Sequence, residues 1–563
     1  MKSVRPSSRF LAVAALAFAS TVAAERWGSK PPPADVVFNV LETELSRSLQ
    51  LLRQETFGPP YFLAYRLHDV RHFETIASLG AGVSDDLEEF RVAYVEARFG
   101  SATFDNTDLS YQGVNGPASS DPGVLRHTFW LLTDQAYRGA VSGWLEKKAK
   151  RATELIGDEL IDFSTAPPQR HTDSLPEPSL NRAQMRLLAQ RLSRIFRDYP
   201  EILDSNVTVG GWWNRRMLLT SEGTRLLTRG EEMPHEIRLN AMTRSDDGMR
   251  LEDGFYIPLR SWSDAPNEAE LEGRVRALAT ELLSLRAAPI QDAETAPAIL
   301  DPEMSGVLFH EALGHKLEGQ RQRDSHESQV FRDLVGKSIL PDFLNLYDDP
   351  TLKTFHGSPL HGSYDYDSEG SPARRVTLVE KGVLRGFLLS RWPVRGFSQT
   401  NGHGRSDPRS HATGRMANLI VEAAGAVRLD QLQERLLELV RHQGKDHGFI
   451  LIGSNGGENP TNRESAQTLE VRPRLVYRVG LDGRRTLVRG VKLVGTPLVV
   501  LNRIVAAGND QTLSNGFQCG AESGWVPVSQ LAPSLLVSQV ELQRLPEDRA
   551  RPPVLPSPLK DSK

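Results

Sequence analysis

The 563-residue sequence contains a single cysteine, Cys519, so the chain cannot form an internal disulfide. Without a covalent cross-link, a chain of this length must draw its stability from buried apolar surface. The composition allows this, because hydrophobic residues make up 39% of the chain and charged residues 25%. We therefore expect a well-packed protein of two or more domains rather than a disulfide scaffold.

The first 24 residues have the three-part layout of a secretory signal peptide. MKSVRPSSRF carries three positive charges, LAVAALAFAS is apolar, and TVAA supplies small residues before Glu25. The apolar run is short for a bilayer span, although retention as an uncleaved anchor is the alternative. We expect a secreted or periplasmic protein with no other membrane segment. Loss of the leader changes the formal charge from −4 to −7, which gives no basis for nucleic-acid binding.

An N-terminal α+β domain is predicted over residues 35–290. Helical periodicity occurs at 37–56, 135–157, 183–199 and 270–288. Runs rich in aromatic and β-branched residues predict strands at 61–70, 90–100, 206–211, 215–223 and 235–245. A proline-rich polar segment at about 163–182 predicts an exposed linker inside this domain.

A C-terminal domain over residues 295–545 is predicted to be dominated by a curved antiparallel β-sheet with one metal-site helix. The turn pairs Lys381-Gly382 and Asp482-Gly483 stand between alternating runs and predict hairpins. The pattern also predicts an amphipathic helix at 429–443, a late strand at 534–544 and a disordered tail at 546–563. The chain as a whole is therefore expected to be of the α+β class.

Residues 309–319, FHEALGHKLEG, place His310 and His315 five positions apart around Glu311. A regular helix turns by about 100° per residue, so the two imidazoles would lie roughly 140° apart and could not bind one metal ion. A π-bulge would bring them nearly into line, and a helix that frays at Gly314 would re-aim His315. One of these distortions is expected if the histidines share a zinc ion; a chance pairing is the alternative.

A catalytic zinc site usually has three protein ligands and an open position for water. Glu318, Asp324 and Cys519 are the candidates for a third ligand. Metal binding would account for a lone thiol in an oxidising compartment, whereas the alternative is a cysteine that is simply a small buried hydrophobe. Glu311, as the neighbour of His310, is the natural general base for zinc-bound water.

Six stretches follow one another in the C-terminal half: FHEALGHKLEG, YDYDSEGSPARRVTLVEKGVLRGFLLS, TNGHGRSDPRSHATGRMANLIVEAAG, GFILIGSNGGENP, VKLVGTPLVVLNRIVAAGND and SNGFQCGAESGWVPVSQLAPSLLVSQVEL. In content and order they resemble the TldD/PmbA family of zinc metallopeptidases, first named as modulators of DNA gyrase, over about residues 295–540. The TldD-like branch of that family carries H-E-x-x-x-H and a late cysteine, whereas the PmbA-like branch lacks the metal site. The resemblance is therefore to the metal-binding branch.

The resemblance implies one Zn²⁺ per chain, bound by His310, His315 and Cys519, with Glu311 as the catalytic residue. It implies a zinc metallopeptidase that hydrolyses peptides or unfolded protein segments through zinc-activated water. It also implies a dimer that encloses the active site, either a homodimer or a heterodimer with a metal-free sister subunit. The leader departs from the cytoplasmic members of the family, so their substrates are not carried over.

The resemblance further implies that the substrate lies as an extended strand against a sheet edge near the zinc. Asn455, Gly456 and Gly457 lie in a glycine-rich stretch that could approach such a strand, and an ordinary turn is the alternative. Arg415 would either bind the substrate or support the site through a structural salt bridge.

Two functions of other classes remain open. A non-catalytic extracytoplasmic peptide-binding or chaperone module with a structural zinc would need four protein ligands, with Glu318 as a candidate for the fourth. A redox-sensing thiol protein would need an exposed, metal-free Cys519, although the chain has no second thiol to resolve an oxidised one. The surroundings of Cys519 distinguish these alternatives.

Overall fold

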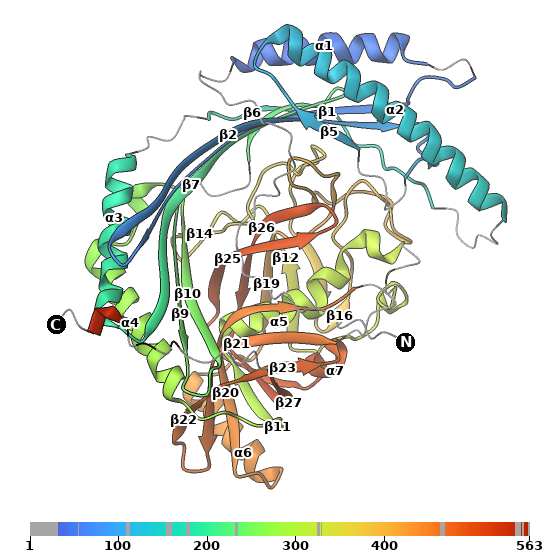
Figure 1. Ribbon diagram of the computed structural model, residues 1–563. Coiled ribbons are helices and arrows are strands. Elements are labelled where there is room, and N and C mark those ends of the chain that lie inside the picture. The colour runs from blue at the N-terminus through green and yellow to red at the C-terminus, as the bar shows by residue number, and fades with distance from the viewer. Residues whose placement is uncertain are drawn as a thin grey trace, which may run out of the picture.

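The computed structural model describes residues 32–53, 56–107, 113–153, 160–175, 181–230, 235–323, 327, 329–461 and 468–545, with 553, 555 and 557–560 near the end. The predicted signal peptide, Asp324 and most of the predicted tail lie outside the described residues. An eight-stranded sheet arches over two smaller sheets, with helices on its outer side (Figure 1). No helix within the described part of the chain is long and apolar enough to span a bilayer.

The eight-stranded sheet is built from the N-terminal half. Its strands are β1 (Phe62–Ser78), β2 (Ala81–Arg98), β5 (Val114–Pro117), β6 (Arg170–Thr172), β7 (Ile202–Thr220), β8 (Arg225–Arg229), β9 (His235–Arg244) and β10 (Arg250–Leu259). They follow the order β10-β9-β7-β1-β2-β5, with β8 on β7 and β6 on β8. The sequence predicted two short strands, 206–211 and 215–223, where the structure has the single long β7, because residues 212–214 continue the strand between them.

Four helices cover the outer face of this sheet (Figure 1): α1 (Ala34–Leu51), α2 (Pro122–Thr153), α3 (Arg182–Arg194) and α4 (Glu268–Ala287). Along β1, alternate side chains face opposite sides, as the period of two in a strand requires. Leu63 and Tyr65 pack in the core under α1 and α2. Phe62 and Ala64 face the other way and join a cluster with Trp392 of the C-terminal half. Both faces of the arched sheet are thus buried, one of them against the C-terminal half.

The segment predicted as an exposed linker is buried where it begins. Phe163 is 2% exposed, its ring lies 4.9 Å from that of Phe62, and the guanidinium of Arg391 lies 3.9 Å from its centre. Arg170–Thr172 then form β6. The prediction of exposure was wrong here because it rested on the polar, proline-rich composition of the whole segment. One aromatic side chain in the segment, Phe163, packs against the inner face of the arched sheet. Residues 176–180 of this segment lie outside the described residues.

The C-terminal half contains two large sheets where the sequence predicted one, and the α+β class is confirmed. The first has seven strands: β11 (Glu294–Leu300), β20 (His447–Glu458), β21 (Leu469–Gly480), β22 (Arg485–Val488), β23 (Val491–Gly495), β24 (Ile504–Ala507) and β27 (Leu535–Arg544). Because β11 pairs with both β20 and β27, five of these strands close into a ring. The closure explains the strong curvature that the sequence predicted.

The second sheet of this half has six strands: β12 (Leu344–Asp348), β15 (Val376–Glu380), β16 (Val383–Leu384), β19 (Asn418–Ala423), β25 (Thr512–Ala521) and β26 (Gly524–Ala532). Most pairings in the two sheets are antiparallel, but each contains one parallel pair, β11–β20 and β19–β26. A parallel pair joins strands that are distant along the chain, so hairpin signals cannot reveal it.

Both predicted hairpin turns of the C-terminal half are present. Lys381-Gly382 joins β15 to β16, and Asp482-Gly483 lies between β21 and β22. Lys381 (φ 47°) and Gly382 (φ 74°) both adopt the left-handed conformation that a tight hairpin turn requires.

The short helix α5 (Pro302–Phe309) lies in the largest core, between the two C-terminal sheets. It contacts β20 and β21 on one side and β25 and β26 on the other. Helix α6 (Leu429–His442) packs on the other face of the first sheet, whereas α7 (Pro497–Asn502) contributes Val500 and Leu501 to the same core as α5. The continuation of α5 therefore emerges between two sheets, and β25 is the edge strand of one of them.

Candidate metal centre

Helix α5 changes its winding after Phe309. Residues His310–Gly314 form a π turn, in which the backbone N–H of His315 donates to the carbonyl of His310, five residues earlier. The wider turn brings both imidazoles to one side of the chain, with ring centres 5.0 Å apart. Of the two distortions that the sequence allowed, the structure contains the π-bulge.

The helix and its π turn are fixed at both ends. Asp301 caps the start, because its side chain accepts a hydrogen bond of 2.9 Å from the backbone N–H of Met304. At the other end, Gly314 allows a close approach of Met416, since a Cβ on Gly314 would overlap the Met416 sulfur. Any larger residue at 314 would displace either Met416 or the adjoining His315.

Cys519 completes a cluster with the two histidines. It lies on β25 opposite Val526 of β26, and its sulfur is 3.5 Å from Nε2 of His315. One ligand atom from each of His310, His315 and Cys519 lies within 4.8 Å of the other two. The structure thus unites three sequence-predicted ligands, two of them from one helix and the third more than 200 residues later along the chain.

The donor set fits a zinc ion. Two imidazoles and one thiolate are the side-chain types that bind Zn²⁺ most often. Nδ1 of His310 is buried and has no hydrogen-bond partner among the described residues, as expected of a group that a ligand would satisfy. Nδ1 of His315, by contrast, lies 3.1 Å from Oε1 of Glu318, which leaves Nε2 directed at Cys519. A carboxylate behind a ligating histidine is the usual outer-shell arrangement in zinc sites.

Electrostatics within the cluster favour a thiolate beside an imidazolium in the metal-free protein. Burial acts to raise the pKa of the Cys519 thiol, but the charges of His315, Arg415 and His310 outweigh it and hold that pKa well below its usual range. Burial also opposes the charged form of His315, yet Cys519 and Glu318 raise its pKa well above the ordinary value. The thiolate, which is the metal-binding form, is therefore the favoured state of Cys519.

Glu318, considered above as a third or fourth ligand, does not join the cluster. Its carboxylate is fully buried. One oxygen contacts Nδ1 of His315, and the other accepts a hydrogen bond of 2.8 Å from Nε of Arg321. Arg321 in turn donates 2.9 Å to Glu522, which follows the Cys519 strand. Sequence reasoning missed Arg321 and Glu522, although the spacing of three between Glu318 and Arg321 on one helical turn was a usable signal.

The half-buried Glu311 lies beside the cluster, as the residue after His310. Burial raises the pKa of its carboxyl, with His310 and His315 acting in the opposite direction. Gly457 packs against its side chain, because a Cβ on Gly457 would fall 2.8 Å from Cγ of Glu311. Asn459 donates 2.8 Å to the backbone carbonyl of Glu311.

The glycine-rich stretch predicted to contact the substrate forms the irregular end of β20. A β-bulge lies between Ser454 and Gly457, and Gly456 has a φ of +96°. Asn455 is turned towards the arched sheet, where its amide donates 3.3 Å to the carbonyl of Glu252 in β10. The stretch is therefore brought to Glu311 through Gly457, and its role with a substrate stays a prediction.

Arg415, predicted either to bind the substrate or to support the site, is fully buried. Its guanidinium donates 3.2 Å to the sulfur and 2.6 Å to the carbonyl of Cys519. It also forms an ion pair of 3.1 Å with Glu318. These contacts favour the supporting role.

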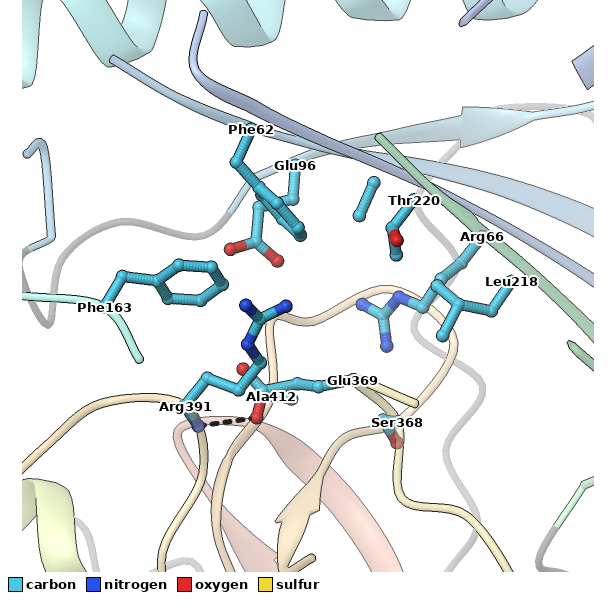
Figure 2. Close-up of a pocket in the computed structure, with 11 residues that line it drawn as sticks. Phe62, Arg66, Glu96, Phe163, Leu218, Thr220, Ser368, Glu369, Arg391 and Ala412 are labelled. Atoms are coloured by element: carbon cyan, nitrogen blue, oxygen red, sulfur yellow. Dashed lines mark hydrogen bonds between the residues drawn. The ribbon is translucent and has the colours of Figure 1, made fainter. Parts of the chain in front are cut away.

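A separate pocket lies between the arched sheet and the C-terminal loops, and it shares no lining residue with the His–His–Cys cluster (Figure 2). Its walls are Phe62, Ala64, Arg66, Glu96, Phe163, Leu218, Thr220, Ser368, Glu369, Arg391 and Ala412. The guanidinium groups of Arg66 and Arg391 reach towards its middle (Figure 2). Both are already paired, Arg391 with Glu222 at 2.7 and 2.8 Å and Arg66 with Ser406 and Ser410. We therefore assign this pocket to the packing between the two halves.

We expect Glu369, which lines this pocket, to make the stability of the protein depend on pH. Burial and the charge of Asp367 raise the pKa of Glu369 to about 8, far above the ~4.3 of an unfolded glutamate. A raised folded-state pKa contributes stability below the unfolded value and loses it as the pH rises through the folded value. At about 1.4 kcal/mol per pKa unit, we expect the wild type to lose at least ~2 kcal/mol of unfolding free energy between pH 5 and 9 relative to Glu369→Gln. Urea denaturation at several pH values measures this.

The Gln side chain can still accept the 2.7 Å hydrogen bond from the backbone N–H of Arg391. Glu380→Gln, on the exposed β15–β16 turn, is the control for removal of one charge. If the unfolding free energies of wild type and Glu369→Gln changed with pH in parallel, the raised pKa of Glu369 would be contradicted.

Comparison with known proteins agrees with this geometry. Residues 293–544 match the family model described as the PmbA/TldA metallopeptidase C-terminal domain. The chain is 29% identical over 336 residues to a metalloprotease of Methanocaldococcus jannaschii, an alignment that covers 58% of this chain and 67% of that protein. It is 28% identical over 248 residues to a protein of Saccharolobus solfataricus named zinc metalloprotease TldD homolog, covering 44% of this chain and 51% of that protein.

The fold extends beyond the matched C-terminal region. The crystal structure of TldE from Thermococcus kodakarensis superposes on this chain with a TM-score of 0.59 at 15% identity, covering 90% of this chain and 100% of that one. At this level of identity the similarity is one of fold alone. The family match and the named relatives together show that the C-terminal region of the chain, residues 293–544, belongs to the TldD/PmbA family.

Proposed function

We propose that this protein is a zinc-dependent peptidase that hydrolyses peptides or unfolded protein segments outside the cytoplasm. The observation that carries the proposal is the cluster of His310, His315 and Cys519, whose ligand atoms lie within 4.8 Å of one another beside Glu311. Those three residues would hold one zinc ion. The names of the relatives support peptidase activity for the family.

The number of protein ligands supports catalysis rather than a structural role. A structural zinc site is closed by four protein ligands, whereas a catalytic site keeps one position open. Among the described residues the cluster contains three ligands, and Glu318 pairs with His315 and Arg321 instead. This count favours the peptidase over the non-catalytic binding module. The burial of Cys519 likewise disfavours an exposed redox sensor.

The positions of the side chains suggest the role of each residue in the reaction. When bound, zinc supplies Lewis acidity, which lowers the pKa of water and polarises a carbonyl. Glu311 accepts the proton of the attacking water and later delivers it to the leaving amine. Glu318 holds His315 in the tautomer with Nε2 free to ligate. Gly457, which has no side chain, leaves room for Glu311 to move its carboxylate towards the substrate.

The proposal pairs an extended substrate strand with one of two edge strands near the site. β25, which carries Cys519, is the edge strand of its sheet, and β10 is the edge strand of the arched sheet. The two strands lie against each other (Figure 1). Backbone hydrogen bonds to such an edge hold a peptide with little dependence on its sequence.

Export and pairing complete the proposal. The leader-like residues 1–24 support export, and the 63% exposed Trp525, on the hairpin that carries Cys519, supports a subunit contact next to the site. The second subunit would be another copy of this chain or a metal-free sister. N-terminal sequencing of the exported protein and light scattering measure the two properties.

The function is tested by cleavage of a fully unfolded protein, such as reduced and alkylated casein, beside a tightly folded one. We expect the zinc-loaded protein to cleave the unfolded substrate, the activity to disappear on chelation, and zinc to restore it. The folded substrate should remain intact, since a strand must be extended to pair with an edge. A protein that holds zinc but cleaves neither substrate would support the binding-module alternative.

A further inference from the structure

Arg415 joins the cysteine ligand to the turn that follows it. Its Nη2 donates to the sulfur of Cys519 at 3.2 Å and to the carbonyl of the same residue at 2.6 Å. Its Nη1 donates to Oγ of Ser523 at 2.8 Å and to the carbonyl of Gly524 at 3.0 Å. One side chain therefore fixes both the sulfur and the β25–β26 turn behind it.

The same guanidinium reaches the histidine ligand through Glu318. Nε of Arg415 lies 3.1 Å from Oε1 of Glu318, an ion pair without hydrogen-bond geometry, and the same oxygen lies 3.1 Å from Nδ1 of His315. Because Nε2 of His315 is 3.5 Å from the Cys519 sulfur, the four side chains form a closed circuit. Arg415 and Glu318 are both 0% exposed, so water does not substitute for either partner.

The chain around Arg415 also contacts the π turn. Met416 fills the space beside Gly314. Gly414 donates its backbone N–H to Gln320, 3.0 Å away, and Gln320 donates to Glu522 at 2.7 Å. Residues 414–416 thus contact both the segment 310–320, which contains the two histidines, and the β25–β26 hairpin, which carries Cys519. These contacts set the distance between the two segments.

We infer that Arg415 is a positioning residue of the metal centre, one that holds the Cys519 sulfur in place and withdraws electron density from it; this inference rests on the proposed function. An N–H donor on a thiolate ligand reduces the charge that the sulfur gives to the metal, and so restores Lewis acidity that a thiolate ligand lowers. Arg321 still pairs with Glu318 when Arg415 is replaced, so the loss falls mainly on Cys519.

The test uses the full chain loaded with Zn²⁺ or with Co²⁺, which reports thiolate ligation by a sulfur-to-cobalt charge-transfer absorption. For Arg415→Lys we expect zinc affinity, measured by chelator competition, to fall about 10–100-fold. The charge-transfer band should move to longer wavelength, because a sulfur without its hydrogen bond gives up charge more readily. A merely structural role would lower thermal stability without moving the band.

Matched variants separate the possible outcomes. Arg391→Lys replaces another buried arginine that pairs with a carboxylate, Glu222, and should leave both affinity and band unchanged. Glu318→Gln breaks the circuit at its other end and should weaken zinc binding even if Arg415→Lys does not fold. The inference would be overturned if folded Arg415→Lys and Glu318→Gln both bound zinc with wild-type affinity and left the charge-transfer band in place. Absence of zinc binding by the wild type would instead overturn the proposed function.

Discussion

Glu311→Gln is expected to reduce peptide hydrolysis by about 10²–10⁴-fold, the range that a general acid–base group contributes. Glutamine keeps the size of the side chain and its packing against Gly457, but it cannot accept a proton. Zinc content should stay at the wild-type level, because Glu311 is outside the cluster of ligands. The measurement is kcat/KM on an unfolded substrate, with zinc determined on the same samples.

The control for this variant is Glu434→Gln, on the exposed side of α6, which should retain wild-type activity. Retention of more than about a tenth of the wild-type rate by Glu311→Gln would assign the proton transfer to another group. Loss of zinc together with activity would mean that Glu311 acts on the metal site rather than on the substrate.

Cys519→Ser is expected to weaken zinc binding by more than ~100-fold, beyond the range of an outer-shell substitution. The serine hydroxyl does not ionise near neutral pH, so a buried anionic donor is lost and Arg415 loses its sulfur partner. A ligand present at 100 times its dissociation constant stabilises a folded protein by about 2.7 kcal/mol. The wild type should therefore melt at a higher temperature with zinc than without it, whereas Cys519→Ser should show little difference.

His310→Gln serves as the matched ligand variant, and it should reproduce the loss of zinc-dependent stabilisation. Melting curves recorded with and without added zinc measure both variants. Equal stabilisation of Cys519→Ser and the wild type would remove the cysteine from the ligand set.

The members of the His–His–Cys cluster could be predicted in part from local signals, whereas the choice of Cys519 over Glu318 and Asp324 came from the family resemblance. His310, Glu311 and His315 stand in one short motif, and Cys519 is the only thiol in the chain. The spacing of five even predicted the π turn as one of two distortions, since a regular helix could not bring the histidines together. Helices and hairpins with clear periodicity, such as α4, α6 and the turn at Lys381-Gly382, were predicted almost to the residue.

What the sequence did not reveal depends on contacts between distant segments. The circuit of Arg415, Glu318 and Cys519 joins residues about 100 positions apart, and their spacing in the sequence does not predict these contacts. The parallel pair β19–β26 and the burial of Phe163 are of the same kind, because each is decided by a partner surface rather than by local composition. The extent of β7 was missed because residues 212–214 continue the strand by pairing with β1, a partner that is distant along the chain.

The most direct test of a zinc centre built from His310, His315 and Cys519 is elemental analysis of the purified protein, wild type beside Cys519→Ser. The account predicts about one zinc per wild-type chain and a large loss of zinc from the variant at the same free zinc concentration. Wild-type protein that holds no zinc after zinc is supplied, or a variant that remains fully loaded, would contradict it.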